Sequence, residues 1–268
     1  MVIKLKLKSQ PEFITEVECI SPDNFAGKKI DEIKNMIVFF GNRERKLSEF
    51  FAVTGKTGKT TEETSIEIEG DCSLIYRIGQ KMTAGTITVN GNVGFHLGSE
   101  ITGGKIIVNG NAGSWVGAMM DGGEIVINGD AGNHCAGAYR GNWIGMKDGK
   151  ITVTGRVGVE SGSWMRATRS RKKYPVLTVG SADYFLGVHN HGGTIICEGD
   201  TEGRTGGDMS HGQIIVKGKI KRMLPSFKKL GAKKEFETPA GTIKGDFIEY
   251  AGDYAVSGKP NGRLYVAK

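Results

Sequence analysis

The chain has 268 residues, a formal net charge of +7, and 42 glycines against 6 prolines. This length is sufficient for a full hydrophobic core, and the glycines do not recur at every third position, which excludes a collagen-like rod. Four scattered cysteines without a Cys-x-x-Cys pair argue against a disulfide framework and against an iron–sulfur or zinc site.

Residues 1–57 are predicted to form a small α/β cap. Residues 2–8 alternate apolar and charged side chains, as a half-exposed strand does. Asp23 and Asn24 are suitable caps for a short helix that includes residues 30–36 (IDEIKNM), and residues 36–40 indicate a strand that ends in a turn at Gly41 and Asn42. Residues 56–60 resemble the end of a phosphate-binding loop, but Val53 replaces the required first glycine, so that motif is rejected.

A repeated pattern organises residues 58–218. Between Gly79 and Gly129 the pattern G-x2-[M/I]-x2-G-x-I-x-[V/I]-x-G occurs three times, each copy starting 19 residues after the last. Further copies end at Gly155, Gly199 and Gly218. A period near 20 residues with short strands and glycine corners is typical of a β-solenoid, in which no coil is stable alone.

The predicted fold class is therefore all-β, a right-handed parallel β-helix of about seven to eight coils. Stacking in register aligns an interior isoleucine column, a second interior column in the Met slot, and an asparagine ladder on the surface. These three sets are, in order, Ile87, Ile106, Ile125 and Ile151; Met82, Ile101, Met120 and Met146; and Asn90, Asn109 and Asn128.

Residues 219–268 leave the pattern and are predicted to form an irregular C-terminal cap or docking arm. The segment carries six aromatic residues, namely Phe227, Phe236, Phe247, Tyr250, Tyr254 and Tyr265. They suggest that the arm packs either on its own solenoid or on a partner, and the sequence does not separate the two.

Candidate chemistry is sparse. His96 and His134 occupy equivalent coil positions two coils apart, with Trp115 between them, so roughly 10 Å separates them, too far to share a zinc ion. The one cluster that stands out is His189, His191, Asp208 and His211, which fall on adjacent coils. Polar corner residues on a solenoid usually face water, so no catalytic residue and no metal ligand is predicted.

Two surface features are more informative. The central residue of each repeat strand points outward, and five of these residues are large and apolar: Ile107, Val126, Leu177, Ile196 and Ile215. A free monomer seldom exposes such a stripe, so we expect a partner protein to cover it, with the chain's own terminal segments as the alternative.

The second surface feature is a basic loop of Arg166, Arg169, Arg171, Lys172 and Lys173. It is a candidate contact for a polyanion, although charged loops are more often only solvated. Binding to nucleic acid is not expected, because no recognised nucleic-acid-binding fold accompanies the charge. With no long apolar run and no signal peptide, the sequence predicts a soluble cytoplasmic protein without a membrane segment.

The repeat, the intervening G-x2-G-x3-G spacing and the opening segment NFAGKKIDEIKN…RKLSEFFAVTG together resemble the C subunit of formylmethanofuran dehydrogenase. The resemblance extends from about Asn24 to Gly218. The glycine pattern alone is also similar to the C-terminal β-helix domain of glutamate synthase and to the related subunit of formyltransferase/hydrolase complexes in methylotrophs. Asn190 and Ile101 depart from methionine in the repeat.

This resemblance implies a non-catalytic scaffold in a ferredoxin-linked oxidoreductase complex of methanogenesis. The complex reduces CO2 and attaches it to methanofuran as N-formylmethanofuran. The family's tungsten or molybdenum pterin, iron–sulfur clusters and binuclear metal centre are implied to lie in other subunits, with no cofactor in this chain. Its implied partners are the pterin-binding and amidohydrolase-like subunits, and the acidic tail of methanofuran is a further candidate partner.

Three alternatives remain open at this point: a subunit of a formyltransferase/hydrolase complex, a glutamate-synthase-like structural module, and a β-helical carbohydrate-active enzyme. The last is disfavoured because such an enzyme stacks charged residues along one groove, whereas the repeat columns here are mostly Gly, Ile, Met and Asn.

Overall fold

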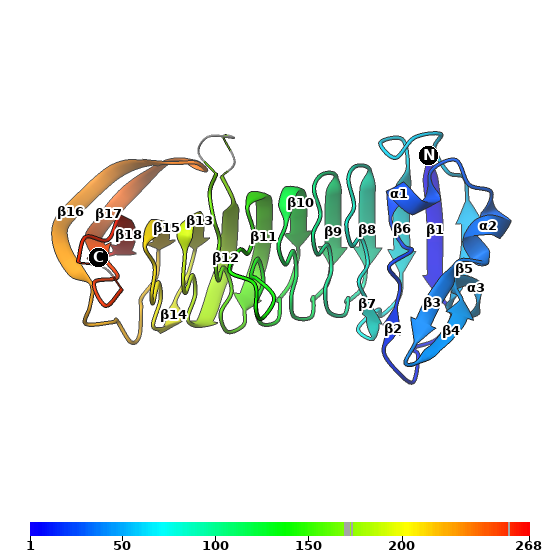
Figure 1. Cartoon of the computed structure of the whole chain (residues 1–268), viewed down its shortest axis with the longest axis horizontal. Helices are drawn as coiled ribbons and strands as arrows, with labels where there is room; N and C mark the ends of the chain where they lie inside the picture. The colour runs from blue at the N-terminus through cyan, green and yellow to red at the C-terminus, as the bar shows by residue number, and fades with distance from the viewer. Residues whose placement is uncertain (169–171, 173, 257) are drawn as a thin grey trace.

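The computed structural model describes residues 1–168, 172, 174–256 and 258–268. A 14-stranded sheet runs along the molecule, and a second sheet of four strands lies at the N-terminal end (Figure 1). Within the described residues no helix is long and apolar enough to cross a membrane.

The N-terminal region combines short helices with strands from both sheets. Its elements are β1 (Val2–Leu7), β2 (Thr15–Glu16), α1 (Pro22–Phe25), α2 (Ile30–Lys34), β3 (Ile37–Phe40), β4 (Arg43–Lys46), α3 (Leu47–Phe50) and β5 (Phe51–Gly55). Strand β1 pairs antiparallel with β5 and parallel with β6 (Ser65–Glu69), so the first strand belongs to the long sheet. The boundary at residue 57 stays a prediction.

The helix predicted to include residues 30–36 is α2, and its N-cap is Lys29, so the prediction that Asp23 and Asn24 cap it is wrong. Ser21 caps α1, because its Oγ accepts a hydrogen bond from the Asn24 amide (3.2 Å), and Pro22 opens the helix. Asp23 lies inside α1, and its carboxylate accepts a hydrogen bond from the Thr83 amide (3.1 Å). Asp23 therefore ties α1 to the first full repeat instead of capping a helix.

The central strands stack as parallel neighbours, in the order β6, β8, β9, β10, β11, β12, β13 and β15. Their bounds, with the short β7 and β14, are β7 (Ile75–Tyr76), β8 (Thr86–Asn90), β9 (Lys105–Asn109), β10 (Asp121–Ile127), β11 (Asp148–Val157), β12 (Val176–Tyr184), β13 (His191–Cys197), β14 (Thr201–Gly203) and β15 (His211–Val216). The 4-stranded sheet has the order β4-β3-β2-β7.

The register confirms the predicted columns. Ile87, Ile106, Ile125 and Ile151 are successive partners and are fully buried. The four residues of the Met slot are also buried. On the surface, the Asn109 amide nitrogen donates to Asn90 Oδ1 (2.8 Å) and that of Asn128 donates to Asn109 Oδ1 (2.9 Å), which forms the expected ladder.

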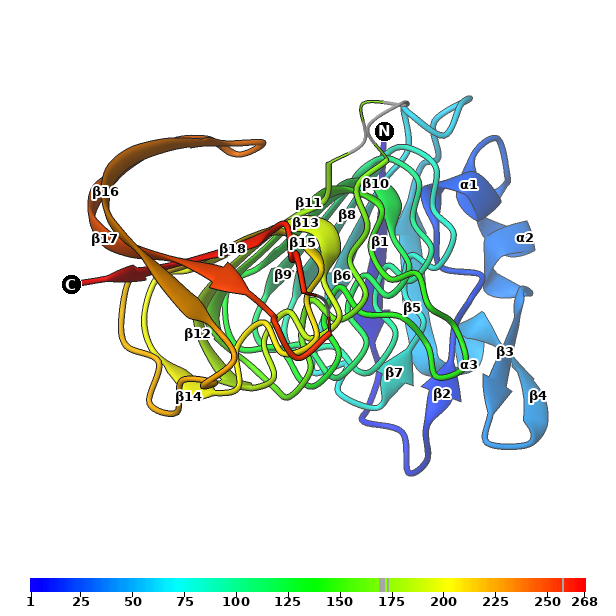
Figure 2. The ribbon, with the colours of Figure 1, turned by 60° about the vertical axis from the view of Figure 1, so that its left-hand side comes forward.

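The C-terminal segment is not irregular, and that prediction is wrong. Strands β16 (Lys228–Thr238) and β17 (Gly241–Gly252) form a long antiparallel hairpin, and β18 (Gly262–Ala267) returns to pair with β17 and, in parallel, with β15. The hairpin arches away from the stack (Figure 2). Its pairing does not follow the 19-residue repeat, so the repeat pattern alone gave no sign of it.

Candidate functional site

The outer apolar stripe is shorter than predicted. Leu177 pairs with Ile151 and Ile195 and is fully buried, so it belongs to the interior column, and Thr178 takes the outward position. Val179 pairs with Val153, but Val153 lies two residues before the closing glycine of its copy, Gly155, whereas Val179 lies one residue before Gly180. Strand β12 is therefore shifted by one residue relative to its closing glycine. A shift of one residue exchanges the two faces of a strand.

The chain itself covers one end of the stripe. Ile196 and Ile215 are buried in a small cluster with Phe236, Phe247 and Tyr265 of the C-terminal strands. For these two residues the alternative prediction, cover by the chain's own terminal segment, is correct. They are therefore not available to another subunit. Ile107 and Val126 lie outside that cluster and are half-buried.

A column of stacked rings follows one corner of the coils. Trp115 stacks on His134 with 4.1 Å between ring centroids, and on His96 with 6.4 Å. The Tyr139 hydroxyl donates to Ser99 Oγ (2.9 Å) and lies 2.9 Å from His96 Nδ1. Burial lowers the pKa of both histidines, which favours neutral rings. The column separates His96 from His134, as the spacing predicted.

Residues at this corner adopt positive φ although they are not glycine. The φ angles of His96, Trp115 and His134 are 64°, 68° and 59°, and Glu160 and Phe185 continue the series at 58° and 65°. Non-glycine residues rarely adopt this conformation. Sequence reasoning had no means of finding it, because no local motif marks it.

The predicted histidine cluster splits into two groups. His189 Nδ1 lies 3.6 Å from Asp208 Oδ2, and the His189 ring stacks on Trp164 at 4.1 Å. His191 and His211 instead share Ser210, whose Oγ lies 2.6 Å from His191 Nδ1 and 3.1 Å from His211 Nδ1. Among the described residues no group of three His, Cys, Asp or Glu side chains is arranged to hold a metal ion.

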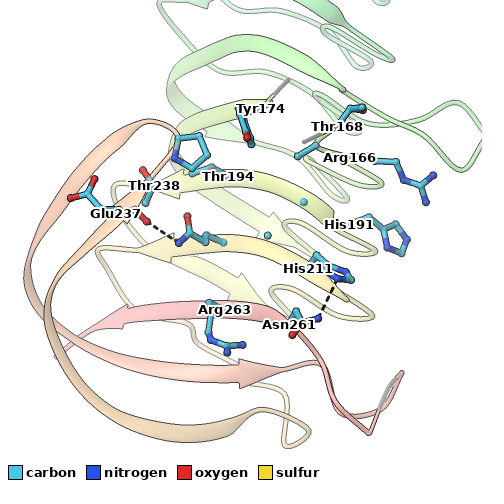
Figure 3. A pocket seen from close by; sticks show the side chains of 15 residues that line it. Arg166, Thr168, Tyr174, His191, Thr194, His211, Glu237, Thr238, Asn261 and Arg263 are labelled. Carbon is cyan, nitrogen blue, oxygen red and sulfur yellow. Dashed lines mark hydrogen bonds between the residues drawn. The ribbon is translucent and has the colours of Figure 1, made fainter. Parts of the chain in front are cut away.

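A cavity of about 1030 Å³ opens beside the second group, between the ends of β13, β15 and β18 and the tip of the β16–β17 hairpin (Figure 3). Polar side chains in its lining include Arg166, His191, His211, Glu237 and Arg263. The Gln213 side chain donates to the Glu237 carbonyl (3.0 Å), which ties the hairpin tip to the sheet. Arg263 lies 3.4 Å from Glu249, so part of its charge is already paired.

One residue of the predicted basic loop, Arg166, lies at this cavity. Arg166 lines the cavity and is exposed, and Lys172 is also exposed. Arg169, Arg171 and Lys173 lie outside the described residues. Sequence reasoning missed the cavity itself, because its far wall comes from the hairpin.

The four cysteines carry no sign of reactivity. Burial raises the pKa of the Cys19, Cys72 and Cys135 thiols to about 12 and that of Cys197 to about 11. Thiolates are the form that attacks electrophiles and binds metals, so these side chains behave as small apolar groups.

The long sheet of short, repeated and largely parallel strands defines a repeat-built, mostly β protein. No protein-family model matches the chain. Over 269 aligned residues it is 42% identical to the C subunit of the tungsten-containing formylmethanofuran dehydrogenase 2 of Methanococcus maripaludis, with 98% of this chain and 95% of that protein covered. On this similarity, the chain belongs to the family of formylmethanofuran dehydrogenase C subunits, which are parts of a multisubunit oxidoreductase.

Two further similarities agree with this assignment. The C subunit of the molybdenum-containing formylmethanofuran dehydrogenase 1 of Methanosarcina barkeri is 47% identical over 81 residues, which cover 30% of this chain and 27% of that protein. Among solved structures, a chain of the formyltransferase/hydrolase complex (FhcABCD) from Methylorubrum extorquens, in complex with methylofuran, has a TM-score of 0.85. It is 25% identical, and 99% of both chains is covered.

Proposed function

We propose that this chain is a non-catalytic scaffold subunit of a cytoplasmic formylmethanofuran dehydrogenase, folded as a right-handed β-helix. The complex would reduce CO2 and attach it to methanofuran as N-formylmethanofuran. The tungsten or molybdenum pterin, the iron–sulfur clusters and the binuclear metal centre would be held by other subunits.

The observation that carries this proposal is how the repeat positions are filled. Residues that coincide from coil to coil are isoleucine and methionine inside and asparagine at the surface, and they are in register over many strands. Such columns stabilise a long, regular surface. His189 pairs with Asp208, and among the described residues no three His, Cys, Asp or Glu side chains converge as metal ligands would.

The half-buried side chains Ile107 and Val126 are the residues proposed to contact another subunit. They lie side by side on β9 and β10 in the parallel register. The ion pair between Lys105 and Glu124 (2.9 Å) flanks them. An apolar contact with a polar border is the usual arrangement of a protein–protein interface.

A subunit of a formyltransferase/hydrolase complex is the second candidate, because the Methylorubrum extorquens structure matches the whole chain. The higher identity to the methanogen subunits, 42% against 25%, favours the dehydrogenase. A glutamate-synthase-like module has no similar support.

We also propose that the basic loop contacts the acidic tail of methanofuran. Arg166 lines the cavity and Lys172 is exposed nearby in sequence. Replacing both by glutamate in the assembled complex is expected to raise KM for methanofuran, because two cations become anions near an anionic tail. Lys59→Glu, an exposed change at the other end of the chain, is the control, and an unchanged KM in the double variant removes this contact.

The scaffold role is tested by an anaerobic affinity purification of the tagged chain from its native host, with mass spectrometry and metal analysis. Recovery with a pterin-binding subunit, an amidohydrolase-like subunit and tungsten or molybdenum is the expected result. Recovery of the chain alone, or with glutamine-handling proteins, contradicts the proposal.

A further inference from the structure

The N-terminal sheet exposes an apolar face that the described parts of the chain leave open. In β3, Ile37 and Phe39 alternate with the buried Val38, and their side chains are 47% and 42% exposed. Ile14, directly before β2, is exposed as well, whereas the exposed Phe13 packs edge-on against Phe40 (5.5 Å between ring centroids) and so belongs to the other face. Three large exposed apolar side chains, Ile14, Ile37 and Phe39, in two neighbouring segments exceed the scattered apolar residues of an ordinary surface.

A groove lies on this face. It has a volume of about 420 Å³, and its apolar lining is Met36, Ile37, Phe39 and the half-buried Cys19. Glu16 lies directly opposite Phe39 in the antiparallel register of β2 and β3, so its carboxylate borders the exposed ring. The groove therefore offers apolar contact and a polar edge together.

The polar edge is acidic. Glu16 and Glu18 both line the groove, and both approach the same guanidinium, since Arg77 Nε lies 3.0 Å from Glu16 Oε1 and 3.6 Å from Glu18 Oε1. Two carboxylates share one cation, which leaves one negative charge. Among the described residues lining the groove there is no lysine or arginine, although the chain as a whole carries a net charge of +7.

Aromatic residues, half-buried or exposed, continue from this sheet onto the coils. Tyr76 of β7 stacks on Phe95, with 4.9 Å between ring centroids and 5° between ring planes. Phe95 is exposed, and His96 beside it begins the stacked ring column. The apolar surface at the N-terminal end therefore extends beyond β3 to the rings of Tyr76 and Phe95.

The chain's own covering segment lies elsewhere. The β16–β17 hairpin buries Ile196 and Ile215 at the C-terminal end, and the β2–β3 region lies at the opposite end of the molecule (Figure 1). The N-terminal groove is thus out of reach of the segment that covers the outer stripe.

We propose that the groove of Met36, Ile37 and Phe39, with Glu16 and Glu18 at its edge, binds a polypeptide segment of another subunit that presents an apolar side chain next to a lysine or arginine. This proposal depends on the proposed scaffold role in one respect: the partner is taken to be another subunit of the same complex. The apolar side chain would remove Ile37 and Phe39 from water, and the cation would meet the unbalanced carboxylate.

Photo-cross-linking of the purified complex tests the occupant. With p-benzoylphenylalanine in place of Phe39, the expected product joins this chain to a peptide of another subunit that contains an apolar residue beside Lys or Arg. A cross-link to a second copy of this chain, or to its own residues, or no cross-link to protein at all, overturns the proposal.

Matched variants test the energetics in the same complex. The double substitution Ile37→Ser and Phe39→Ser is expected to weaken retention of the chain about tenfold or more, because a buried aromatic residue often dominates an interface. Leu230→Ser removes an apolar side chain that is 54% exposed at the C-terminal end, and it should leave retention unchanged. Equal melting temperatures of the free variants show that both are folded.

Glu18→Lys tests the charge. It should weaken retention about threefold at low ionic strength, with a smaller effect at high salt, because salt screens exposed charges. Retention of the Ile37/Phe39 variant at the wild-type level overturns this inference while leaving the scaffold role intact. A wild-type chain that associates with no other subunit overturns both.

Discussion

At the scale of the single residue, Gly91 shows why the corners of the repeat require glycine. At Gly91 φ is +147°, and a Cβ there would overlap the carbonyl oxygen of Gly70 on the preceding coil. That oxygen belongs to the backbone, and the Gly70 amide donates a hydrogen bond to the Asn90 carbonyl (3.3 Å), so a shift of Gly70 away from Gly91 would disturb the pairing of the two coils. Two separate constraints, backbone conformation and close approach, therefore act at one position.

Gly91→Ala is expected to lower the free energy of unfolding by about 3–4 kcal/mol, combining an unfavourable φ with overpacking. Gly231 has the same φ of +147° but no heavy atom within 4 Å of its would-be Cβ. Gly231→Ala should then cost about 1 kcal/mol. Urea unfolding of both variants gives the comparison, and equal losses would show that the overlap with Gly70 is relieved at no cost.

Asn190 shows how a departure from the repeat is accommodated. It occupies the Met slot and is fully buried, yet its amide group is satisfied. Its Oδ1 accepts hydrogen bonds from the Gly192 amide (3.0 Å) and the Gly193 amide (2.7 Å), and its Nδ2 donates to the Gly193 carbonyl (3.0 Å). The asparagine therefore replaces apolar packing with hydrogen bonds to the backbone at the start of β13.

The C-terminal hairpin is the element that decides which outer residues are free. Phe236 stacks on Tyr265 with 3.7 Å between ring centroids and meets Phe247 edge-on at 5.6 Å. These rings cover Ile196 and Ile215, so an element outside the repeat completes the surface of the last coils. The Tyr265 hydroxyl lies 3.3 Å from Glu249, and burial, followed by that carboxylate, raises the pKa of Tyr265 to about 12.

Phe236→Ala should destabilise the hairpin by about 3–5 kcal/mol, because it removes the ring that joins β16 to the sheet. The effect belongs to this element, so hydrogen exchange should accelerate in β16 and β17 and stay slow in β8 to β10. Leu230→Ala, on the exposed side of β16, is the control. Uniformly faster exchange along the whole chain would contradict a local role for Phe236.

At the scale of the whole molecule, the two ends of the stack are protected differently. At the N-terminal end β1 and β5 extend the long sheet, and at the C-terminal end β18, β17 and β16 do so. The middle coils, with Ile107 and Val126, have neither cover among the described contacts. The proposed docking of other subunits along this middle follows from that distribution.

The double substitution Ile107→Lys and Val126→Lys should abolish assembly while leaving the chain folded. Both side chains are half-buried, so lysine can reach water in the free chain, but burying its charge in an apolar interface is unfavourable. Native mass spectrometry of the complex and circular dichroism of the free chain are the measurements. The matched control is Met223→Lys with Leu230→Lys, two exposed apolar residues near the C-terminus. An intact complex with the Ile107/Val126 variant would exclude this face as an interface.

The sequence by itself determined the stacked strands, the interior columns and the asparagine ladder. These features follow from a side-chain alternation of two and a repeat of 19 residues, both of which are local and recur often enough to be read. The family resemblance rested on the same repeat, on the intervening G-x2-G-x3-G spacing and on the opening segment before it. An insertion precedes the strand of Leu177, and there the outward position counted from the closing glycine was wrong by one residue. Only pairing with the neighbouring strands fixes the register of such a strand.

Only the tertiary structure decided what covers the outer surface. The β16–β17 hairpin folds back over Ile196 and Ile215, forms one wall of the cavity near Arg166, and leaves the Phe39 groove open at the opposite end. It also decided that His189 pairs with Asp208 while His191 shares Ser210 with His211. The hairpin contacts join segments that share no repeat and no local pattern, so packing of the whole chain selects them. The repeat places the histidines on adjacent coils, but only the side-chain geometry selects the partner of each.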